Sequence, residues 1–214
     1  MKITKMKKFI VGNSFKNWVF IKLYTDEGLV GLGEATAGLS TMAQAAELDE
    51  LEGLVIGQDP LQPERLWQSL YKKLYLRSSI AMNGIVLACW DILGKALGAP
   101  VWRLLGGKQR DSLRVYANGW YTGPRNPASY GEAAAAMAQK GYTALKFDPF
   151  GKAYMTLDRR EERVSQALVA AVRKAVGPDV DLCIEAHDRF CVPEAIRIGH
   201  WLEEYDPLFL EAPV

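Results

Sequence analysis

The second half of the chain alternates short apolar runs with amphipathic segments, and this alternation constrains the fold more than any other feature. The apolar runs lie at residues 115–117, 142–147, 182–185 and 208–211, with helical sequence between them at 126–140, 158–177 and 193–204. Asp158 and Glu161 have capping-box spacing at the head of the second of these helices. This β-α-β-α-β-α-β order predicts a parallel sheet with right-handed crossovers. Four strands and three helices are half of an eightfold barrel, which takes roughly 250 residues when complete.

The last three apolar runs each carry a charged side chain at or near their carboxyl end. Strand side chains alternate between faces, so Lys146 should face away from its apolar neighbours. The next run ends in Glu185 and is followed by His187, and the last run ends in Glu211. Ligands bind at the carboxyl ends of strands in α/β proteins, so these charged ends in series predict a site.

The first half of the chain has a different organisation. Strand-like alternation covers residues 3–11, 17–25 and 29–35, and helical sequence covers Thr41–Ile56, Pro63–Leu76 and Ser79–Leu97. Strands followed by helices predict a small α+β domain built on an antiparallel meander. The pattern changes after Gly107, so we expect two domains, residues 1–107 and 108–214.

The composition is that of an ordinary globular protein and narrows the classes of partner. The 214 residues carry a net charge of +1, which gives no support for nucleic-acid binding. The basic start lacks the apolar core of a signal peptide, and residues 84–93 are too short for a membrane span. Three cysteines without CxxC spacing indicate neither a disulfide framework nor a zinc site. We expect a cytoplasmic protein with a small-molecule substrate and no membrane or nucleic-acid partner.

Two segments carry a family resemblance. One is Asn-Gly-Ile-Val-Leu-Ala-Cys-Trp-Asp-Ile-Leu-Gly-Lys at 83–95, continuing through Leu-Gly-Ala-Pro-Val at 97–101 to Leu-Leu-Gly-Gly at 104–107. The other is Thr-Asp-Glu-Gly-Leu-Val-Gly-Leu-Gly-Glu at 25–34. They resemble the enolase superfamily, specifically its mandelate racemase/muconate lactonizing enzyme group. The resemblance covers the whole chain and implies an α+β capping domain followed by a TIM-like barrel, truncated here after its fourth strand.

The resemblance implies a divalent cation, usually Mg²⁺, held by carboxylates at the ends of three consecutive barrel strands. Glu185 and Glu211 match the first two positions, and the third belongs to a strand that this sequence lacks. A proton alpha to a carboxylate is weakly acidic, and a hard cation on the carboxylate oxygens stabilises the enediolate that forms. Mg²⁺ prefers such oxygen ligands. From position alone, either glutamate is better explained as an ordinary rim carboxylate or salt-bridge partner, and it is the resemblance that favours a metal ligand.

His187 lies in Glu-Ala-His-Asp-Arg, which resembles the Asp/Glu-x-His-x-Arg pattern of sugar-acid dehydratases. There the histidine protonates the departing β-hydroxyl, a task that suits an imidazole near neutral pH. A glycine usually follows it; here Asp188 does, and its charge would raise the pKa of His187 or disturb the site. Arg189 either anchors substrate or pairs with Asp188. We interpret His200, on a helix, as structural.

Lys146 corresponds to the first lysine of the Lys-x-Lys pair on the family's second barrel strand. The second position is Asp148, which excludes a lysine base there and disfavours a two-base racemase. Lys146 is then expected to orient the substrate carboxylate, and a rim salt bridge to Asp148 is the alternative. We assign Lys146 both to the catalytic residues and to substrate binding, and Asp148 to substrate binding.

One further departure from the family pattern and one loop complete the predicted site. Glu211 is followed by Ala-Pro where the family usually has Glu-Pro, which should lower metal affinity modestly. Residues 12–17 occupy the place of a capping-domain loop that reads the far end of the substrate. This loop contains Asn13, Ser14 and Lys16, and we assign Lys16 to substrate binding.

Together these features favour a Mg²⁺-dependent dehydratase of a sugar acid. A cycloisomerase, racemase or epimerase on the same scaffold is the alternative, and a non-catalytic fragment or assembly domain is the alternative from another class. We expect a homo-oligomer for a full-length parent. We expect the 214 residues alone to be inactive, because the third carboxylate and the base would lie on later strands and the sheet would end in an unpaired edge.

Overall fold

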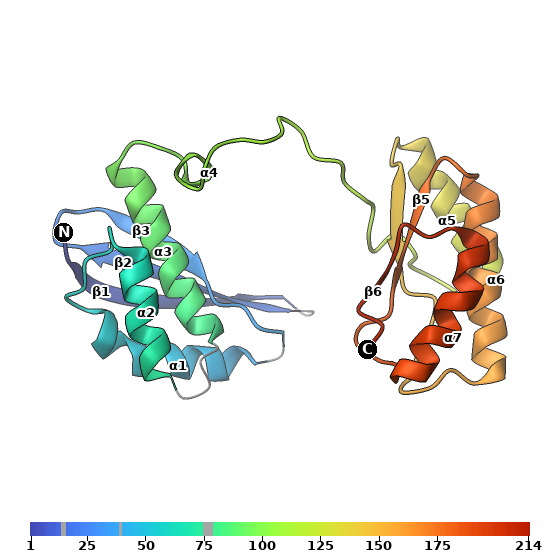
Figure 1. The fold of residues 1–214 in the computed structure, drawn as a ribbon, viewed down its shortest axis with the longest axis horizontal. Helices are drawn as coiled ribbons and strands as arrows, with labels where there is room; N and C mark the ends of the chain where they lie inside the picture. The colour runs from blue at the N-terminus through green and yellow to red at the C-terminus, as the bar shows by residue number, and fades with distance from the viewer. Residues whose placement is uncertain (14–15, 39, 75–78) are drawn as a thin grey trace. The chain divides into compact units, whose positions relative to one another are not determined.

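Residues 1–13, 16–38, 40–74 and 79–214 are described in a computed structural model of the chain (Figure 1). They form two compact units, Met1–Asp111 and Ser112–Val214, which we call the first and second units. The domain boundary after Gly107 stays a prediction. In the described residues, no helix combines the length and the apolarity needed to cross a membrane.

The sheet of the first unit is the predicted antiparallel meander. β1 (Ile3–Gly12), β2 (Asn17–Thr25) and β3 (Val30–Glu34) pair in that order. The period-two alternation of β2 explains its burial, because Val19, Ile21 and Leu23 are fully buried while Lys22 is exposed. The buried face of β2 therefore carries the core of this unit.

The helices of the first unit begin where the sequence predicts. They are α1 (Thr41–Val55), α2 (Pro63–Lys73), α3 (Ile80–Ala96) and the short α4 (Val101–Leu104), which was not predicted. α3 begins after Ser79, whose hydroxyl accepts a hydrogen bond from the Met82 N–H at 2.9 Å. The predicted end of the second helix at Leu76 lies outside the described residues.

Two glycines in β3 let α3 pack directly on the strand backbone. A Cβ atom on Gly33 would lie 1.9 Å from the carbonyl oxygen of Gly84, and one on Gly31 would lie 2.1 Å from that of Ala88. No side chain fits in that space, and the obstacle is backbone that cannot rotate away. The contact between sheet and helix thus depends on the absence of side chains at these positions.

We predict that Gly33→Ala lowers the free energy of unfolding by about 3 kcal/mol, because overpacking forces the helix off the strand. The matched control is Gly53→Ala in α1, where a Cβ meets nothing within 4 Å. That change should raise stability by about 0.5–1 kcal/mol, the usual gain for alanine over glycine in a helix. Urea titrations measure both variants. Equal stabilities for the two would contradict the close packing.

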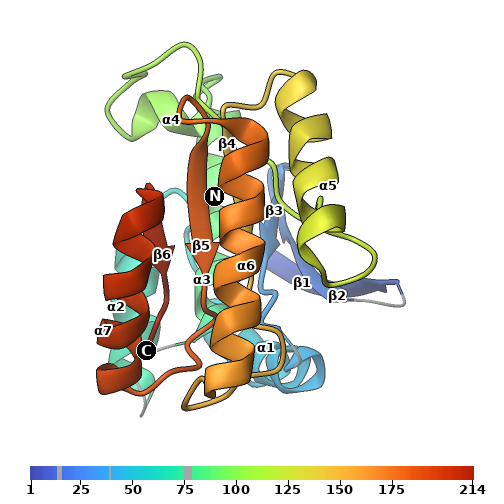
Figure 2. The same cartoon turned by 90° about the vertical axis from the view of Figure 1, so that its right-hand side faces the viewer.

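The second unit contains the predicted parallel sheet. β4 (Ala144–Phe147), β5 (Asp181–Glu185) and β6 (Phe209–Glu211) pair in parallel in that order. The connecting helices are α5 (Pro127–Gln139), α6 (Arg159–Val176) and α7 (Val192–Leu202), the last followed by a 3-10 turn at Glu203–Tyr205. Figures 1 and 2 show these helices on one face of the sheet. The order and direction predicted from the sequence are confirmed.

The run at 115–117 was predicted as a full strand, and this prediction is wrong. The chain runs alongside β4 only at Ala117, whose N–H donates to the Ala144 carbonyl and whose carbonyl accepts from the Lys146 N–H. Ala117 and Leu145 therefore form an isolated bridge. Val115 and Tyr116 remain exposed.

The sheet of the second unit has two chemically different faces. Leu145, Phe147, Leu182 and Ile184 are fully buried in the core that the sheet forms with its helices. Strand alternation sends Lys146, Cys183 and Glu185 to the other face. Charged side chains are thus concentrated on the face without helices, as the sequence pattern predicted.

Candidate active site

Lys146, Glu185 and Glu211 converge at the carboxyl ends of β4, β5 and β6. The Lys146 Nζ lies 2.6 Å from an Oε2 of Glu185 and 2.7 Å from the Oε2 of Glu211. The parallel register explains the meeting, because Glu185 and Glu211 are direct partners across β5 and β6. Lys146 and Glu185 are both buried, whereas the Glu211 side chain is 41% exposed. One ammonium is therefore shared by two carboxylates.

The electrostatics of this cluster favour its charged form. Burial by itself lowers the pKa of Lys146, but hydrogen bonds to Glu185 and Glu211 outweigh it and raise that pKa above its ordinary value. Burial likewise raises the pKa of Glu185, and the bonds from Lys146 and from the His187 N–H outweigh this and lower it. The cluster therefore combines one ammonium with two carboxylates. It retains a negative excess that a further cation would neutralise.

Two ion pairs considered from the sequence, Lys146 with Asp148 and Arg189 with Asp188, are not the ones that the structure contains. Lys146 does not form the rim salt bridge to Asp148, because its ammonium is taken by the two glutamates. Arg189 does not pair with its neighbour Asp188. Its Nη2 lies 2.7 Å from both carboxylate oxygens of Asp148, because the guanidinium turns back across the strand ends toward β4. Substrate contacts of Lys146, Asp148 and Arg189 stay predictions.

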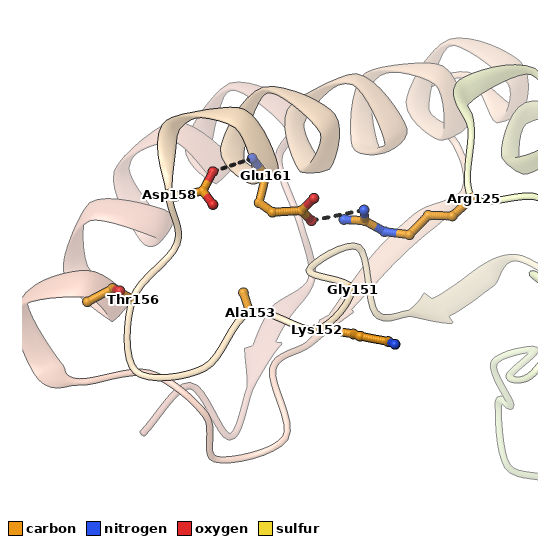
Figure 3. A pocket seen from close by; sticks show the side chains of 7 residues that line it. All are labelled: Arg125, Gly151, Lys152, Ala153, Thr156, Asp158 and Glu161. Atoms are coloured by element: carbon orange, nitrogen blue, oxygen red, sulfur yellow. Dashed lines mark hydrogen bonds and ion pairs between the residues drawn. The ribbon is translucent and has the colours of Figure 1, made fainter.

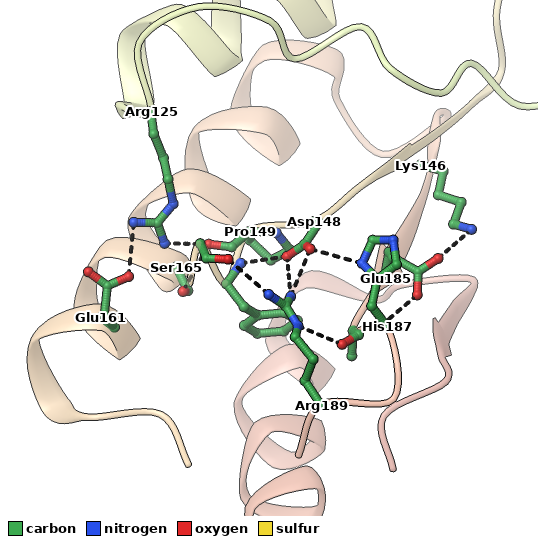
Figure 4. Close-up of polar contacts among 12 residues, drawn as sticks. Arg125, Lys146, Asp148, Pro149, Glu161, Ser165, Glu185, His187 and Arg189 are labelled. Carbon is green, nitrogen blue, oxygen red and sulfur yellow. Dashed lines mark hydrogen bonds and ion pairs between the residues drawn. The ribbon is translucent and has the colours of Figure 1, made fainter. Parts of the chain in front are cut away.

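His187 lies beside this second ion pair. Its Nδ1 is 3.0 Å from Oδ2 of Asp148, and its side chain is 61% exposed. Figure 4 shows Asp148 between Arg189 and the His187 ring, with Lys146 and Glu185 on the far side of that ring. The structure thus brings the predicted acid next to the predicted metal ligands.

The turn that carries His187 has an unusual backbone. His187 and Asp188 both have a φ of 53°, a left-handed conformation that costs roughly 1–2 kcal/mol for each such residue. The Glu185 carboxylate accepts the His187 N–H at 2.8 Å. The N–H groups of Ala186, Asp188 and Phe190 donate to the carbonyls of Glu211, Ala212 and Pro213. These bonds hold the strained turn, so Asp188 adopts the geometry expected of the family's glycine.

Lys16 belongs to the first unit. Its ammonium lies 5.7 Å from the centre of the Trp18 ring, and its N–H donates to the Asn13 side chain at 2.8 Å. Its role in substrate binding stays a prediction. Ser14, named in the same predicted loop, lies outside the described residues.

Sequence reasoning missed the aromatic residues next to the cluster. The Lys146 Nζ lies 5.8 Å from the centre of the Tyr116 ring, and the Trp120 indole N–H donates to the Lys146 carbonyl at 2.9 Å. Burial, followed by the charge of Asp148, raises the pKa of Tyr121. The available signal was the density of aromatics just after the first predicted barrel strand. Aromatic residues there are equally typical of a hydrophobic core, so the pattern alone did not distinguish core residues from residues next to the site.

An open hollow lies on the other side of the β4 end (Figure 3). It is lined by Arg125, Gly151, Lys152, Ala153, Thr156, Asp158 and Glu161. Arg125 pairs with Glu161 at 2.9 Å and donates to the Pro149 carbonyl at 2.6 Å. Glu161 was predicted to complete a capping box with Asp158. The Asp158 carboxylate does cap α6, but the structure directs Glu161 to Arg125. In Figure 4 this pair is separated from Lys146 and Glu185 by Asp148 and Pro149.

The donor set fits a hard divalent cation. Within the described ranges, no group of three or more His, Cys, Asp or Glu side chains is arranged to hold a metal. Glu185 and Glu211 nevertheless direct one oxygen each at a single positive charge, the Lys146 ammonium, which marks where a cation is favoured. Mg²⁺ is usually held by one or two carboxylates together with water and substrate oxygens. The two glutamates match that requirement.

Two family models match most of the chain. Residues 7–106 match the mandelate racemase/muconate lactonizing enzyme N-terminal domain, and residues 129–214 match the enolase C-terminal domain-like family. The chain belongs to the mandelate racemase/muconate lactonizing enzyme group of the enolase superfamily. Its fold is that of the superfamily: an α+β domain followed by part of the barrel.

Individual relatives are similar over almost the whole chain. The chain is 38% identical over 201 residues to a D-gluconate dehydratase of Thermoproteus tenax, covering 92% of this chain and 40% of the relative. It is 36% identical over 218 residues to a D-galactonate dehydratase of Klebsiella pneumoniae, covering 100% and 56%. A crystal structure of an enolase superfamily member from Salmonella Typhimurium superposes with a TM-score of 0.93 at 32% identity, covering 100% and 61%. The chain thus spans about half the length of these curated relatives.

We predict that Lys146→Met lowers the free energy of unfolding by about 3 kcal/mol in the presence of a chelator, because two neighbouring carboxylates lose their shared cation. Adding Glu185→Gln to this variant should recover part of the loss. Lys140→Met on the exposed end of α5 is the control and should change stability by less than about 0.5 kcal/mol. Urea titration measures all three. An effect of Lys146→Met no larger than that of the control would show that the shared ion pair is not formed.

Proposed function

We propose that this site serves the dehydration of a sugar acid, with D-gluconate and D-galactonate as the first substrates to test. The observation that carries the proposal is the arrangement of Glu185, Glu211 and His187 at adjacent strand ends. The similarity to dehydratases named for those two acids supports it. The reaction removes the α-proton, expels the β-hydroxyl as water and gives a 2-keto-3-deoxy acid.

In this mechanism Glu185 and Glu211 would hold the divalent cation. When bound, Mg²⁺ supplies positive charge at the substrate carboxylate, where charge accumulates as the α-proton is lost. Lys146 places a further positive charge beside the two glutamates and favours an acidic substrate. His187 donates its proton to the β-hydroxyl oxygen as the carbon–oxygen bond breaks. The bonding electrons leave with that oxygen, and the product is water.

The alternative on the same scaffold is a cycloisomerase, racemase or epimerase. Asp148 in place of a lysine base weighs against the usual two-base racemase, because its carboxylate is already bonded to Arg189 and His187. An epimer or a lactone keeps an oxygen atom on every carbon, whereas a 2-keto-3-deoxy acid has a carbonyl at C2 and a methylene at C3. Product analysis by NMR therefore separates the classes.

The test of the metal uses the complete product of the gene, incubated with D-gluconate or D-galactonate. We predict that Mg²⁺ supports formation of a 2-keto-3-deoxy acid and that exhaustive chelation abolishes it until Mg²⁺ is restored. Glu185→Gln should lose metal binding, measured by calorimetry, together with turnover, because an amide keeps the shape and loses the charge. Glu132→Gln, on the exposed surface of α5, is the control. Turnover that survives complete removal of divalent cations would overturn the proposal.

The role of His187 is tested separately from the metal. We predict that His187→Asn suppresses dehydration by about 10²-fold or more, the usual contribution of a general acid. Exchange of the substrate α-proton with solvent deuterium should persist, because a different group removes that proton. Both are followed by NMR in one sample. If exchange and dehydration fall equally, His187 is the base or a structural support.

A further inference from the structure

We propose that Asp148 is a positioning residue that fixes neutral His187 as its Nδ1–H tautomer and leaves Nε2 as the proton-exchanging atom. This inference rests on the proposed function for its use in catalysis, but its geometry stands without it. The two residues come from different strands, since Asp148 follows β4 and His187 follows β5. The contact between them is the 3.0 Å approach of Nδ1 to Oδ2.

The tautomer follows from what a carboxylate can do. An ionised carboxylate only accepts hydrogen bonds. Arg189 contributes a positive charge 2.7 Å from both oxygens of Asp148, and the Phe150 N–H donates to Oδ1 at 2.9 Å. Each of these groups donates, so the Asp148 oxygens act as acceptors in this network. Nδ1 of His187 must therefore be the donor, and in the neutral ring the lone pair lies on Nε2.

The carboxylate is itself held in place. The Arg189 Nε donates to the Ala186 carbonyl and its Nη1 to the Gly151 carbonyl, each at 2.8 Å. The guanidinium is thus bonded to the loop after β4 and to the turn after β5. An imidazole that is 61% exposed would otherwise be free to rotate. Asp148 gives this exposed ring one orientation, as Figure 4 shows.

The consequence for the reaction is a defined proton path. The imidazolium carries a proton on each nitrogen, and only the Nε2 proton is not engaged by Asp148. Transfer of that proton to the β-hydroxyl oxygen, with cleavage of the carbon–oxygen bond, releases water. The ring remains neutral with Nδ1–H still bonded to Asp148. No tautomer change is needed before Nε2 takes up the next proton from solvent.

The test is the ¹⁵N spectrum of the 214-residue chain labelled at histidine, recorded without metal or substrate. The chain has only two histidines, so His200→Gln assigns His187 directly. Spectra are recorded as the pH is raised until the ring-nitrogen shifts stop changing, so that the neutral rings are the ones observed. The expected result is a protonated Nδ1 and a bare Nε2 on His187. A predominant Nε2–H in the unaltered chain would overturn the inference.

A pair of variants separates positioning from general structure. Asp148→Ala removes the acceptor, and the tautomer ratio should shift by about tenfold or more toward Nε2–H, the form that histidine prefers in water. Asp188→Asn removes the adjacent carboxylate, keeps a residue that tolerates a left-handed backbone, and should leave the ratio unchanged. Equal shifts in both variants, or none in Asp148→Ala, would contradict the proposal.

If circular dichroism shows that Asp148→Ala does not fold, the spectrum of the unaltered chain still tests the proposal. Because no turnover is measured, a failed dehydratase assay leaves this result intact.

Discussion

Two carboxylates side by side on parallel strands are the constraint on which the rest of the site depends. Parallel strands end at the same edge, and the register makes Glu185 and Glu211 direct partners. Like charges at that spacing repel, and the burial of Glu185 increases the cost because solvent screens its charge less. The Lys146 ammonium, from the neighbouring strand β4, contacts both carboxylates and offsets their repulsion. At this edge of the sheet the two carboxylates outnumber the one ammonium.

Much of the fold could be predicted because the sequence signals were local. Strand alternation placed Lys146 and Glu185 on the face opposite Leu145 and Ile184, and the structure confirms this separation. The N-cap of α6 at Asp158 was equally readable from its neighbours. The strand at 115–117 was not predicted correctly, because its pairing depends on how far the chain follows β4, which no local pattern encodes.

The sequence predicted which residues form the candidate site better than it predicted the contacts between them. Glu185, Glu211, His187 and Lys146 could be singled out because each ends or follows an apolar run. The partners of Arg189 could not, since a long flexible side chain reaches several acceptors and the nearest in sequence, Asp188, is not the one it takes. Glu161 illustrates the same limit, because Arg125 is 36 positions away in the chain yet close in space. Long charged side chains are placed by the tertiary fold.

The turn carrying His187 is bonded to the last residues of the chain. Its N–H groups at Ala186, Asp188 and Phe190 all donate to carbonyls of Glu211, Ala212 and Pro213. The strained conformation persists only while those acceptors are in register. Local opening of β6 would therefore displace the imidazole and the Glu211 carboxylate in one event. His187 and Glu211, the proposed proton donor and cation ligand, therefore behave as a single cooperative element that is either assembled or lost as a whole.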